Sequence, residues 1–468
     1  MYLGYDGDKR VDIDPNDLAT HAVVLGRTGS GKTGLIVTLL EEVAKSGVSA
    51  VVFDPKGDLT NLALSLTTVA DFQRYVESGL DASSEHAKHL TGLTSSGMDF
   101  THVAAFKAAV NVVIYAPGAT TGRGRSINMF PMFAVPQTTD AAQLRERAAR
   151  DVATVLQAVN VNTDRYDPAL VYLSAVVSAS WARRVPFPID KWPGALSDPP
   201  DWLPPFGGMT ADDFFPKRAR MNLARTLIGF RHQADRWFQG EVINLSAMVA
   251  GRPTISIFTM RHLSEDERLF FSSTVLNSVV DFMFESPASR KLKLLVVLDE
   301  ARGYLPPYPA APSTKAPITT LLSQGRAHGI GMIIGTQNPM DLDYKALSNV
   351  GTWFVGRLRT RDLVRDLEQE LRNRGVDTDT IENNTPRGFL TLDKGGTAHQ
   401  LAVRWTLSYL RGPLGLQEIP GPAPDVRRPQ ASQPVGPPVA PTLDRMIDQT
   451  LGQSKLKFIQ RLLGGNPE

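Results

Sequence analysis

A short glycine-rich segment near the amino terminus has the residue types needed to bind phosphate groups. Residues 26–33 read GRTGSGKT; they follow the β-branched run HAVVL (21–25), which predicts a strand, and they open a segment of helical character, 33–44. A strand, such a loop and a helix together form the Walker A motif. Its glycines allow backbone N–H groups to curl around phosphates, and the N-terminus of the helix contributes a positive dipole end. The sequence therefore predicts a nucleoside triphosphate site here.

The side chains of this segment have separate expected roles. Lys32 should reach the β- and γ-phosphates as a point charge, and Thr33 should place its hydroxyl on Mg²⁺. We therefore expect ATP and Mg²⁺ as the ligands of the site. The residues expected to contact the nucleotide are Gly26, Thr28, Gly29, Ser30, Gly31, Lys32, Thr33 and Gly34.

A second motif that can do chemistry lies far downstream. The apolar run LLVVL (294–298) ends in Asp299 and Glu300. In a P-loop ATPase, an aspartate at this position holds the Mg²⁺ hydration shell, and an adjacent glutamate polarises the attacking water as a general base. A buried strand that ends in a solvated acidic turn is the simpler alternative. The presence of the Walker A motif favours the catalytic interpretation.

Gln337 follows the next apolar run, GMIIGT (331–336). In P-loop ATPases with an adjacent catalytic glutamate, this strand often lies between the two motif strands, so that a polar residue at its end faces the γ-phosphate. Gln337 fits this sensor role, in which it orients water or reports phosphate loss. A glutamine that makes only a structural hydrogen bond in a turn is the alternative.

Short β-branched runs recur along the chain and indicate the fold class. The central ones are continuous apolar runs, which is typical of strands covered on both faces. Helix-like stretches lie between many of them, and this alternation predicts a mostly parallel α/β sheet, here a RecA-like P-loop NTPase core. The predicted strands lie at 21–25, 49–54, 111–116, 254–259, 293–299, 331–336, 352–358, 388–393 and 400–406.

The spacing of these runs predicts an interrupted core. Residues 1–120 and 251–412 carry the strands, whereas 121–250 contains helix-like stretches and a Pro-rich segment and is expected to form a helical insertion subdomain. Nine prolines within 413–441 predict an extended linker or arm. The last segment, 442–468, has apolar residues at helical intervals and is expected to form an amphipathic helix.

Composition excludes several other kinds of site. The 468 residues include no cysteine, so disulfides, thiolate metal sites and cysteine nucleophiles are excluded. The formal charge of +2, from 50 basic and 48 acidic residues, neither demands nor forbids nucleic acid. The polar start shows no signal peptide, and no apolar run approaches the about 20 residues that cross a bilayer. We therefore expect a cytoplasmic protein with no membrane partner.

Four stretches of the chain together resemble one group of ATPases. They are HAVVLGRTGSGKT, VVFDPKGDL, VVLDEARGYLP and SQGRAHGIGMIIGTQNPMDLDYKALSNVGTWFVGRL. In order and spacing they resemble the HerA/FtsK superfamily of ring-forming, DNA-pumping ATPases, and a bacterial HerA-like branch in particular. The resemblance covers about 21–60 and 250–410. It implies a hexamer with ATP sites at the subunit boundaries and DNA passing through the centre.

The same resemblance implies further site residues. In such rings an arginine of the adjacent subunit completes each ATP site, and Arg326 in SQGRAHGIG matches the family position best. Arg357 and Arg359, in VGRLRTR, are the next candidates. A solvated surface arginine is the simpler alternative for each. Asp54, in FDPKGDL, matches a family string and is expected near the site or at the subunit interface.

Basic side chains on loops that face the pore are the expected DNA contacts, because a translocase grips phosphates without reading bases. A solvated surface charge is the simpler alternative for each. The candidates are Arg123, Arg125, Lys217, Arg218, Arg220 and Lys315. Only about 20 residues precede the first predicted strand, so the N-terminal β-barrel of archaeal HerA proteins is expected to be absent.

Together these features predict an enzyme that hydrolyses ATP to drive a hexameric translocase or helicase along double-stranded DNA. We expect it to act with a nuclease or another effector, in DNA end processing such as repair or in antiviral defence against foreign DNA. Two alternatives stay open: a nucleotide-binding ring that serves as a scaffold for an effector enzyme, and a conjugation or secretion coupling ATPase. DNA-stimulated ATP hydrolysis distinguishes the translocase from the scaffold.

Overall fold

The computed structural model describes the chain from residue 1 to residue 420, with internal gaps. The residues left out within that range are 120, 131–132, 162, 344, 359–367, 370–378, 394 and 396–397. The predicted C-terminal helix (442–468) and most of the predicted Pro-rich linker (413–441) lie outside the described residues. Within the described start of that linker, Leu414 and Ile419 are buried against the core.

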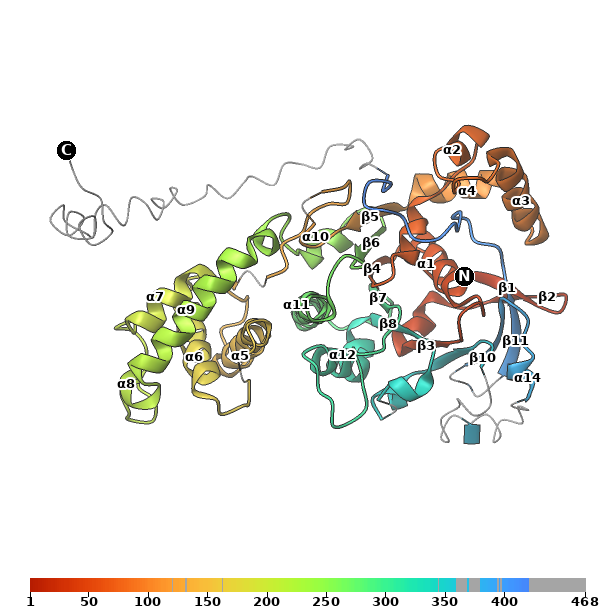
Figure 1. Cartoon of the computed structure of the whole chain (residues 1–468). Coiled ribbons are helices and arrows are strands. Elements are labelled where there is room, and N and C mark those ends of the chain that lie inside the picture. Colours follow the sequence, from red (N-terminus) through yellow and green to blue (C-terminus); the bar gives the residue numbers. More distant parts are fainter. Residues whose placement is uncertain are drawn as a thin grey trace, which may run out of the picture. The chain divides into compact units, whose positions relative to one another are not determined.

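Eleven strands form one sheet in the described part of the chain. They are β1 (Tyr2–Asp6), β2 (Lys9–Asp12), β3 (Ala22–Leu25), β4 (Ser49–Asp54), β5 (Asn111–Tyr115), β6 (Thr254–Thr259), β7 (Leu294–Leu298), β8 (Ile330–Thr336), β9 (Thr352–Val355), β10 (Gly388–Leu392) and β11 (Ala398–Val403). Their order is β2-β1-β11-β10-β9-β3-β8-β7-β4-β6-β5 (Figure 1). All neighbours from β9 to β5 pair in parallel, and β10, β11, β1 and β2 continue the sheet with antiparallel pairs.

The predicted strands are all present, as β3 to β11, and the mostly parallel α/β fold is confirmed. The strand before Gln337 has its expected place, because β8 lies between β3 and β7. The register pairs Leu25 with Thr336 and Leu298 with Ile334, so the carboxyl ends of these three strands lie at the same edge of the sheet. β1 and β2 are not among the predicted strands; β1 pairs with β11, from the far end of the described chain, and such a pairing has no local sequence signal.

Helices connect most of the strands and fill the long interval between β5 and β6. The α-helices are α1 (Lys32–Lys45), α2 (Val69–Gln73), α3 (Ala82–Ser95), α4 (Phe100–Ala109), α5 (Ala141–Ala158), α6 (Pro168–Ala182), α7 (Trp192–Ser197), α8 (Ala211–Phe214), α9 (Lys217–Gln233), α10 (Leu245–Val249), α11 (Glu265–Glu285), α12 (Lys315–His328) and α14 (Asp379–Glu382). Short 3₁₀ helices are η1 (Pro15–Thr20), η2 (Asp58–Ala63), η3 (Ile189–Lys191), η4 (Asp235–Phe238), η5 (Pro339–Asp341) and η6 (Ala346–Asn349).

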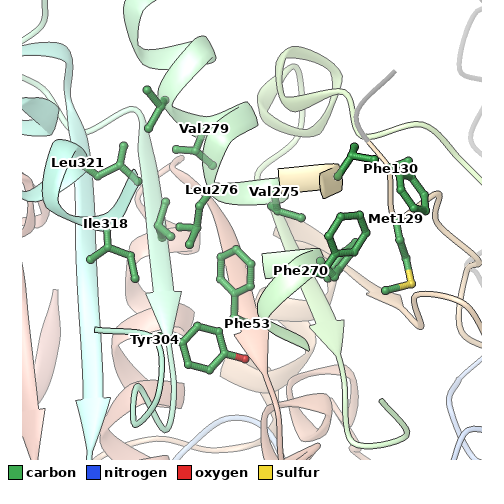
Figure 2. Close-up of a cluster of buried hydrophobic side chains, with 14 of the residues drawn as sticks. Phe53, Met129, Phe130, Phe270, Val275, Leu276, Val279, Tyr304, Ile318 and Leu321 are labelled. Atoms are coloured by element: carbon green, nitrogen blue, oxygen red, sulfur yellow. The ribbon is translucent and has the colours of Figure 1, made fainter. Parts of the chain in front are cut away.

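Helices cover both faces of the central strands. Successive residues of a strand face opposite sides of a sheet, and in β4 Val52 belongs to one buried cluster whereas Phe53 belongs to the other. The cluster with Val52 includes apolar residues of α1 and α4, and the cluster with Phe53 includes those of α11 and α12. Figure 2 shows Phe53 near Leu276 of α11 and Ile318 of α12. A strand buried on both faces explains why SAVVFD is a continuous apolar run.

The segment between β5 and β6 contains α5 to α10 and, among its described residues, no strand. Polar contacts join its first helix, α5, to α11. Arg147 is 2.9 Å from Asp281 and 3.1 Å from Glu285, and Asn277 Nδ2 donates to Thr154 Oγ1 at 3.3 Å. These contacts attach the helical segment to a helix that packs on the sheet. None of the helices in the described ranges is both long and apolar enough to span a bilayer.

Candidate nucleotide site

The loop after β3 has the backbone of a phosphate-binding loop. Gly29 (φ 79°) and Gly31 (φ 94°) both lie in the left-handed region, which residues with a side chain adopt only with strain. Gly31 is the N-cap of α1, and the N–H groups of the first turn have no side-chain cap. Free donors at a helix N-terminus bind anions. The loop can therefore wrap around phosphate groups as expected.

Lys32, the first residue of α1, lies among the acidic residues of the second motif. Its Nζ is 3.1 Å from Asp299 Oδ1 and 2.7 Å from Glu300 Oε1. Lys32 and Asp299 are buried, and the side chain of Glu300 is 17% exposed. The order β3-β8-β7 brings the two motifs together at the carboxyl ends of the strands. Two segments far apart in sequence thus form one site.

Gln337 lies between the loop and Glu300. Its Nε2 donates to Glu300 Oε1 at 2.6 Å, and its Oε1 accepts the Thr28 hydroxyl at 2.9 Å. A side chain that contacts both motifs can respond when a γ-phosphate arrives or leaves. This position fits the predicted sensor role, which stays a prediction.

Lys56 is a site residue that the sequence analysis does not single out. It follows β4, and its Nζ is 2.7 Å from Glu300 Oε1. The contact depends on the sheet order, because β4 is the neighbour of β7 and the loop after β4 meets the end of β7. The only sequence signal is indirect: Lys56 lies in the string FDPKGDL, which matches the family.

Asp54 holds the loop that carries Lys56. It is fully buried at the end of β4, and its carboxylate accepts the N–H groups of Gly57 at 2.8 Å and Leu59 at 2.9 Å. Burial first, and then the nearby Asp299 carboxylate, raise the pKa of Asp54 to about 8. Asp54 therefore acts on the site by positioning a loop.

The surroundings of Glu300 keep its carboxylate ionised. Burial raises its pKa, but Lys32, Gln337 and Lys56 outweigh burial and lower the pKa to about 2. The residue also has φ 52°, a left-handed conformation that is uncommon for residues other than glycine and that clusters at functional sites. An ionised carboxylate beside a phosphate-binding loop can accept a proton from water, as a general base does.

The residues at this edge of the sheet fit ATP and Mg²⁺. Thr33, in the first turn of α1, and Asp299, after β7, offer hard oxygen ligands. Mg²⁺ in such sites is bound by one or two protein groups together with substrate phosphates. A dedicated cage is not needed, and no group of three or more His, Cys, Asp or Glu suited to a metal occurs in the described residues. Lys32, Lys56 and the free N–H groups supply positive charge for a triphosphate.

The arginines expected to act across a subunit boundary have different positions. Arg326 is exposed in the last turn of α12, which ends just before β8 begins, so it lies at the sheet edge opposite the P-loop. Arg357 follows β9, and its carbonyl accepts the Arg27 N–H at 3.1 Å, so it lies beside the loop of its own chain. Arg359 lies outside the described residues. Of the two arginines that the structure describes, Arg326 is the one that lies away from the P-loop of its own chain.

Some of the basic side chains expected to contact DNA are exposed, and the others pair with acidic residues of the chain. Arg123, Lys217 and Arg218 are exposed. Arg125 is half-buried, and its guanidinium is 3.3 Å from the Glu241 carboxylate. The three exposed residues stay candidates for phosphate contacts.

Arg220 is a structural residue, which corrects its assignment to DNA. Its side chain is fully buried, donates to the carbonyls of Phe215 at 2.9 Å and Leu196 at 3.0 Å, and pairs with Asp212. A guanidinium with these partners cannot reach a phosphate. Helix α9 turns this position inward, whereas Arg218 stays on the outside.

Lys315, the first residue of α12, is also engaged, with Asp343 and with the loop before the helix, and this contradicts its assignment to DNA. Its Nζ is 2.8 Å from Asp343 Oδ2 and donates to the carbonyls of Pro306 at 2.8 Å and Ala310 at 3.3 Å. These contacts fix the loop between β7 and α12. The ammonium group of Lys315, which was expected to face DNA, is therefore bound by groups of its own chain.

Comparison with known proteins relates this site to other ATPases. Residues 2–106 match the family model "Helicase HerA, central domain". The bacterial plasmid coupling protein TrwB, solved with the ATP analogue ADPNP, has a similar structure (TM-score 0.54, 13% identity, 89% of this chain and 92% of that chain covered). TrwB with ADP and Mg²⁺ gives a TM-score of 0.51 at 13% identity, with 85% and 88% covered. VirB4 of Thermoanaerobacter pseudethanolicus gives 0.48 at 15% identity, with 86% and 96% covered. No curated protein matches the sequence significantly.

The structural similarity to TrwB concerns the fold, whereas the family match concerns the sequence of one segment. The likeness to TrwB, at 13% identity, shows a common fold over most of both chains. The HerA match covers the segment that contains the P-loop, α1 and the loop with Lys56. The P-loop therefore lies in a segment that matches the HerA central domain, and the chain shares its fold with TrwB, with the P-loop joined to Asp299 and Glu300 in the expected strand order.

Proposed function

We propose that this chain is an ATP-driven translocase of double-stranded DNA that works as a hexamer with a nuclease or another effector. The observation that carries the proposal is the contact of Glu300 with Lys32 and Gln337 beside the uncapped N-terminus of α1. This arrangement combines the groups that ATP hydrolysis needs, and hydrolysis supplies the energy for movement. The match to a HerA central domain supports DNA as the track.

In this proposal hydrolysis begins with a movement of Lys32. Its ammonium leaves the two carboxylates for the β- and γ-phosphates, which carry more negative charge. Glu300 then holds the attacking water and accepts its proton, while Gln337 keeps the carboxylate aligned with the P-loop. Thr33 and Asp299 would hold Mg²⁺, which would neutralise charge on the phosphate oxygens.

The hexamer is proposed because Arg326 needs a second subunit to act. It is exposed at the sheet edge opposite the P-loop of its own chain, and it projects from α12, which packs on the sheet. In a ring, such an arginine can complete the ATP site of a neighbour and respond when the γ-phosphate leaves. ATP turnover in one subunit then changes the contact with the next.

DNA phosphates are the proposed partners of the exposed basic side chains. Lys217 and Arg218 begin α9, and Arg123 lies in a Gly-rich loop after β5. Contacts of this kind are independent of base sequence and weaken with salt. They suit a motor that moves along any duplex, in end processing, repair or antiviral defence.

A coupling ATPase is the second candidate, and the fold shared with TrwB, a bacterial conjugative coupling protein, favours it. A scaffold that binds nucleotide and organises an effector enzyme is the third. The ionised Glu300 favours hydrolysis over mere binding, yet hydrolysis alone does not separate a scaffold from a motor.

ATP hydrolysis by the full chain, measured with and without linear double-stranded DNA, tests the proposal. We expect DNA to raise the rate severalfold and Glu300→Gln to abolish both rates. The double variant Lys217→Glu/Arg218→Glu should lose the stimulation and keep the basal rate. Lys9→Glu, a charge reversal at an exposed position of β2, is the matched control and should keep both. A rate that ignores DNA contradicts translocation by this chain and favours the scaffold.

A further inference from the structure

A cavity opens next to the P-loop, on the side away from Glu300. Its volume is about 300 Å³, and it lies between the first turn of α1, helix α3 and the segment that follows β11. A cavity of this size is at the lower end of those that hold small ligands. The lining residues used below are Gly31, Gly34, His89, Arg387, Trp405 and Tyr409.

The position of the cavity follows the expected course of a nucleotide. Glu300 and Gln337 mark where the γ-phosphate must lie, and the first-turn N–H groups of α1 bind the phosphates that precede it. The rest of the nucleotide must leave the loop at its other side. Gly31 and Gly34 line the cavity there, and a Cβ placed on Gly34 would meet no atom within 4 Å. The space beyond the phosphates is therefore open and continuous with the P-loop.

One wall of the cavity is formed by the planar guanidinium of Arg387, which lies over the ring of Trp405. The guanidinium carbon of Arg387 lies 4.7 Å from the centre of the Trp405 ring. The ring also packs closely on Gly92 of α3, where an added Cβ would lie 2.2 Å from Trp405 Cδ2. Arg387 donates to the Val403 carbonyl at 2.7 Å, and no described carboxylate lies within ion-pair distance of it. A guanidinium without an acidic partner can stack on a second planar group.

His89 makes this wall rigid. Its Nδ1 accepts the indole N–H of Trp405 at 2.9 Å, and its Nε2 lies 3.3 Å from the Leu407 carbonyl, to which it can donate. Burial lowers the pKa of His89 to about 4, so the ring is neutral near pH 7 and can fill both roles. Trp405 is thereby held in one orientation, as a fixed platform for Arg387.

The backbone of Arg387 belongs to the same structure as the P-loop. Its N–H donates to the Ser30 carbonyl at 2.9 Å, and it has φ 70°. A Cβ on Gly31 would lie 2.9 Å from Arg387 Cα, so the glycine is needed for this close approach. Whatever stacks on Arg387 is therefore held at a fixed distance from the phosphates.

From these contacts we infer that the cavity binds the nucleobase and ribose of the nucleotide, with the base stacked on Arg387. The inference rests on the proposed nucleotide site and adds to its phosphate-binding loop a cavity for the base and the ribose. A planar ligand suits the aromatic and histidine walls, and the charged residues Glu85 and Lys88, which also line the cavity, pair with each other at 3.3 Å. The residues of these walls come from α3, from the position just before β10 and from the segment after β11, which carry none of the sequence motifs.

The test compares ATP with inorganic tripolyphosphate, which has the phosphates but no base. Binding of each to the full chain is measured by calorimetry in the presence of Mg²⁺. We expect the wild type to bind ATP at least about 10-fold more tightly than tripolyphosphate. Arg387→Ala should weaken ATP about 10-fold and leave tripolyphosphate within about twofold. Arg10→Ala, which removes another arginine stacked on an aromatic ring (4.3 Å from the Tyr2 centroid), is the matched control and should change neither.

A second variant keeps the test decisive where Arg387→Ala fails to fold. Gly34→Leu fills the cavity from a helical position and should raise helix propensity, so we expect an unchanged thermal unfolding midpoint, weaker ATP binding and retained tripolyphosphate binding. Equal loss of both ligands in the variants, or no loss of either, overturns the base-binding role. If the wild type binds neither ATP nor tripolyphosphate, the proposed nucleotide site itself is wrong.

Discussion

The ammonium group of Lys32 lies 2.7 Å from Glu300 Oε1, and Lys56 lies at the same distance from the same oxygen. Glu300 is therefore held by two cations. Lys32 and Lys56 supply positive charge for a triphosphate, and they keep Glu300, the expected general base, ionised. In the proposed mechanism ATP binding breaks the contact between Lys32 and Glu300, so this pair takes part in both binding and catalysis.

Replacing Lys32 and Glu300 one at a time should separate ATP binding from ATP hydrolysis. Lys32→Ala should abolish ATP binding, because it removes the cation for the phosphates. Glu300→Gln should bind ATP as tightly as the wild type or more tightly, since Lys32 then has only the Asp299 carboxylate to leave, while kcat falls by about 10²–10⁴-fold. Fluorescent-nucleotide titration and phosphate-release assays measure the two effects. Turnover by Glu300→Gln at the wild-type rate would show that another group is the base.

Lys56→Met should lower kcat and shift its pH dependence. Loss of this cation raises the pKa of Glu300 toward its ordinary value, so the acid limb of the kcat profile moves to higher pH. We expect a fall in kcat of about 10-fold or more with little change in the KM for ATP. Lys45→Met removes a lysine of similar exposure that pairs with Glu42, and it should leave the profile unchanged. An unshifted acid limb in Lys56→Met would remove Lys56 from the account.

Arg326 should act on a neighbouring subunit. Arg326→Ala should bind ATP normally and lose about 10³-fold in kcat. Mixing it with Lys32→Ala subunits should restore activity, because each ring then contains boundaries that combine an intact P-loop with an intact Arg326. A mixture of Lys32→Ala and Glu300→Gln subunits, whose defects lie in the same site, should stay inactive. Activity of Arg326→Ala alone, or no recovery in the first mixture, would contradict the role in trans.

Arg404 should matter for stability. Its guanidinium is fully buried, 2.9 Å from Glu41 and 3.0 Å from Glu42, and it donates to the Tyr2 carbonyl at 3.1 Å. Arg404→Met leaves the buried Glu41 carboxylate without its cation and leaves Glu42 paired with Lys45 alone, so we expect a loss of about 3–5 kcal/mol in the free energy of unfolding. Arg10→Met, which removes an exposed pair with Asp12, should cost less than about 1 kcal/mol. Urea unfolding followed by circular dichroism compares them; equal midpoints would contradict the assignment.

Local sequence patterns predict which strand ends meet at the candidate site. The P-loop, Asp299 and Gln337 each follow an apolar strand, and side chains at the ends of neighbouring parallel strands meet at one edge of the sheet. The expected place of the strand before Gln337 then brings that residue to Glu300, where it is found. Each step depends on residues adjacent in sequence and on one rule of strand order.

Other site residues depend on contacts between distant segments and could not be predicted in this way. Lys56 reaches Glu300 only because β4 lies beside β7, and Arg387 reaches Ser30 from more than three hundred residues downstream. Basic composition is a poor guide as well. Arg218 and Arg220 are two residues apart in one helix, yet the first is exposed and the second is fully buried, because only packing decides which side of α9 faces inward.

The most direct measurement of the central claim is displacement of a third DNA strand from a linear duplex. The strand is annealed as a triplex near one end, the full chain is added with ATP and Mg²⁺, and release of the labelled strand is followed over time. The account predicts release that requires ATP and fails with Glu300→Gln and with a non-hydrolysable analogue. If the strand stays bound while the wild type hydrolyses ATP at a DNA-stimulated rate, the protein is not a translocase.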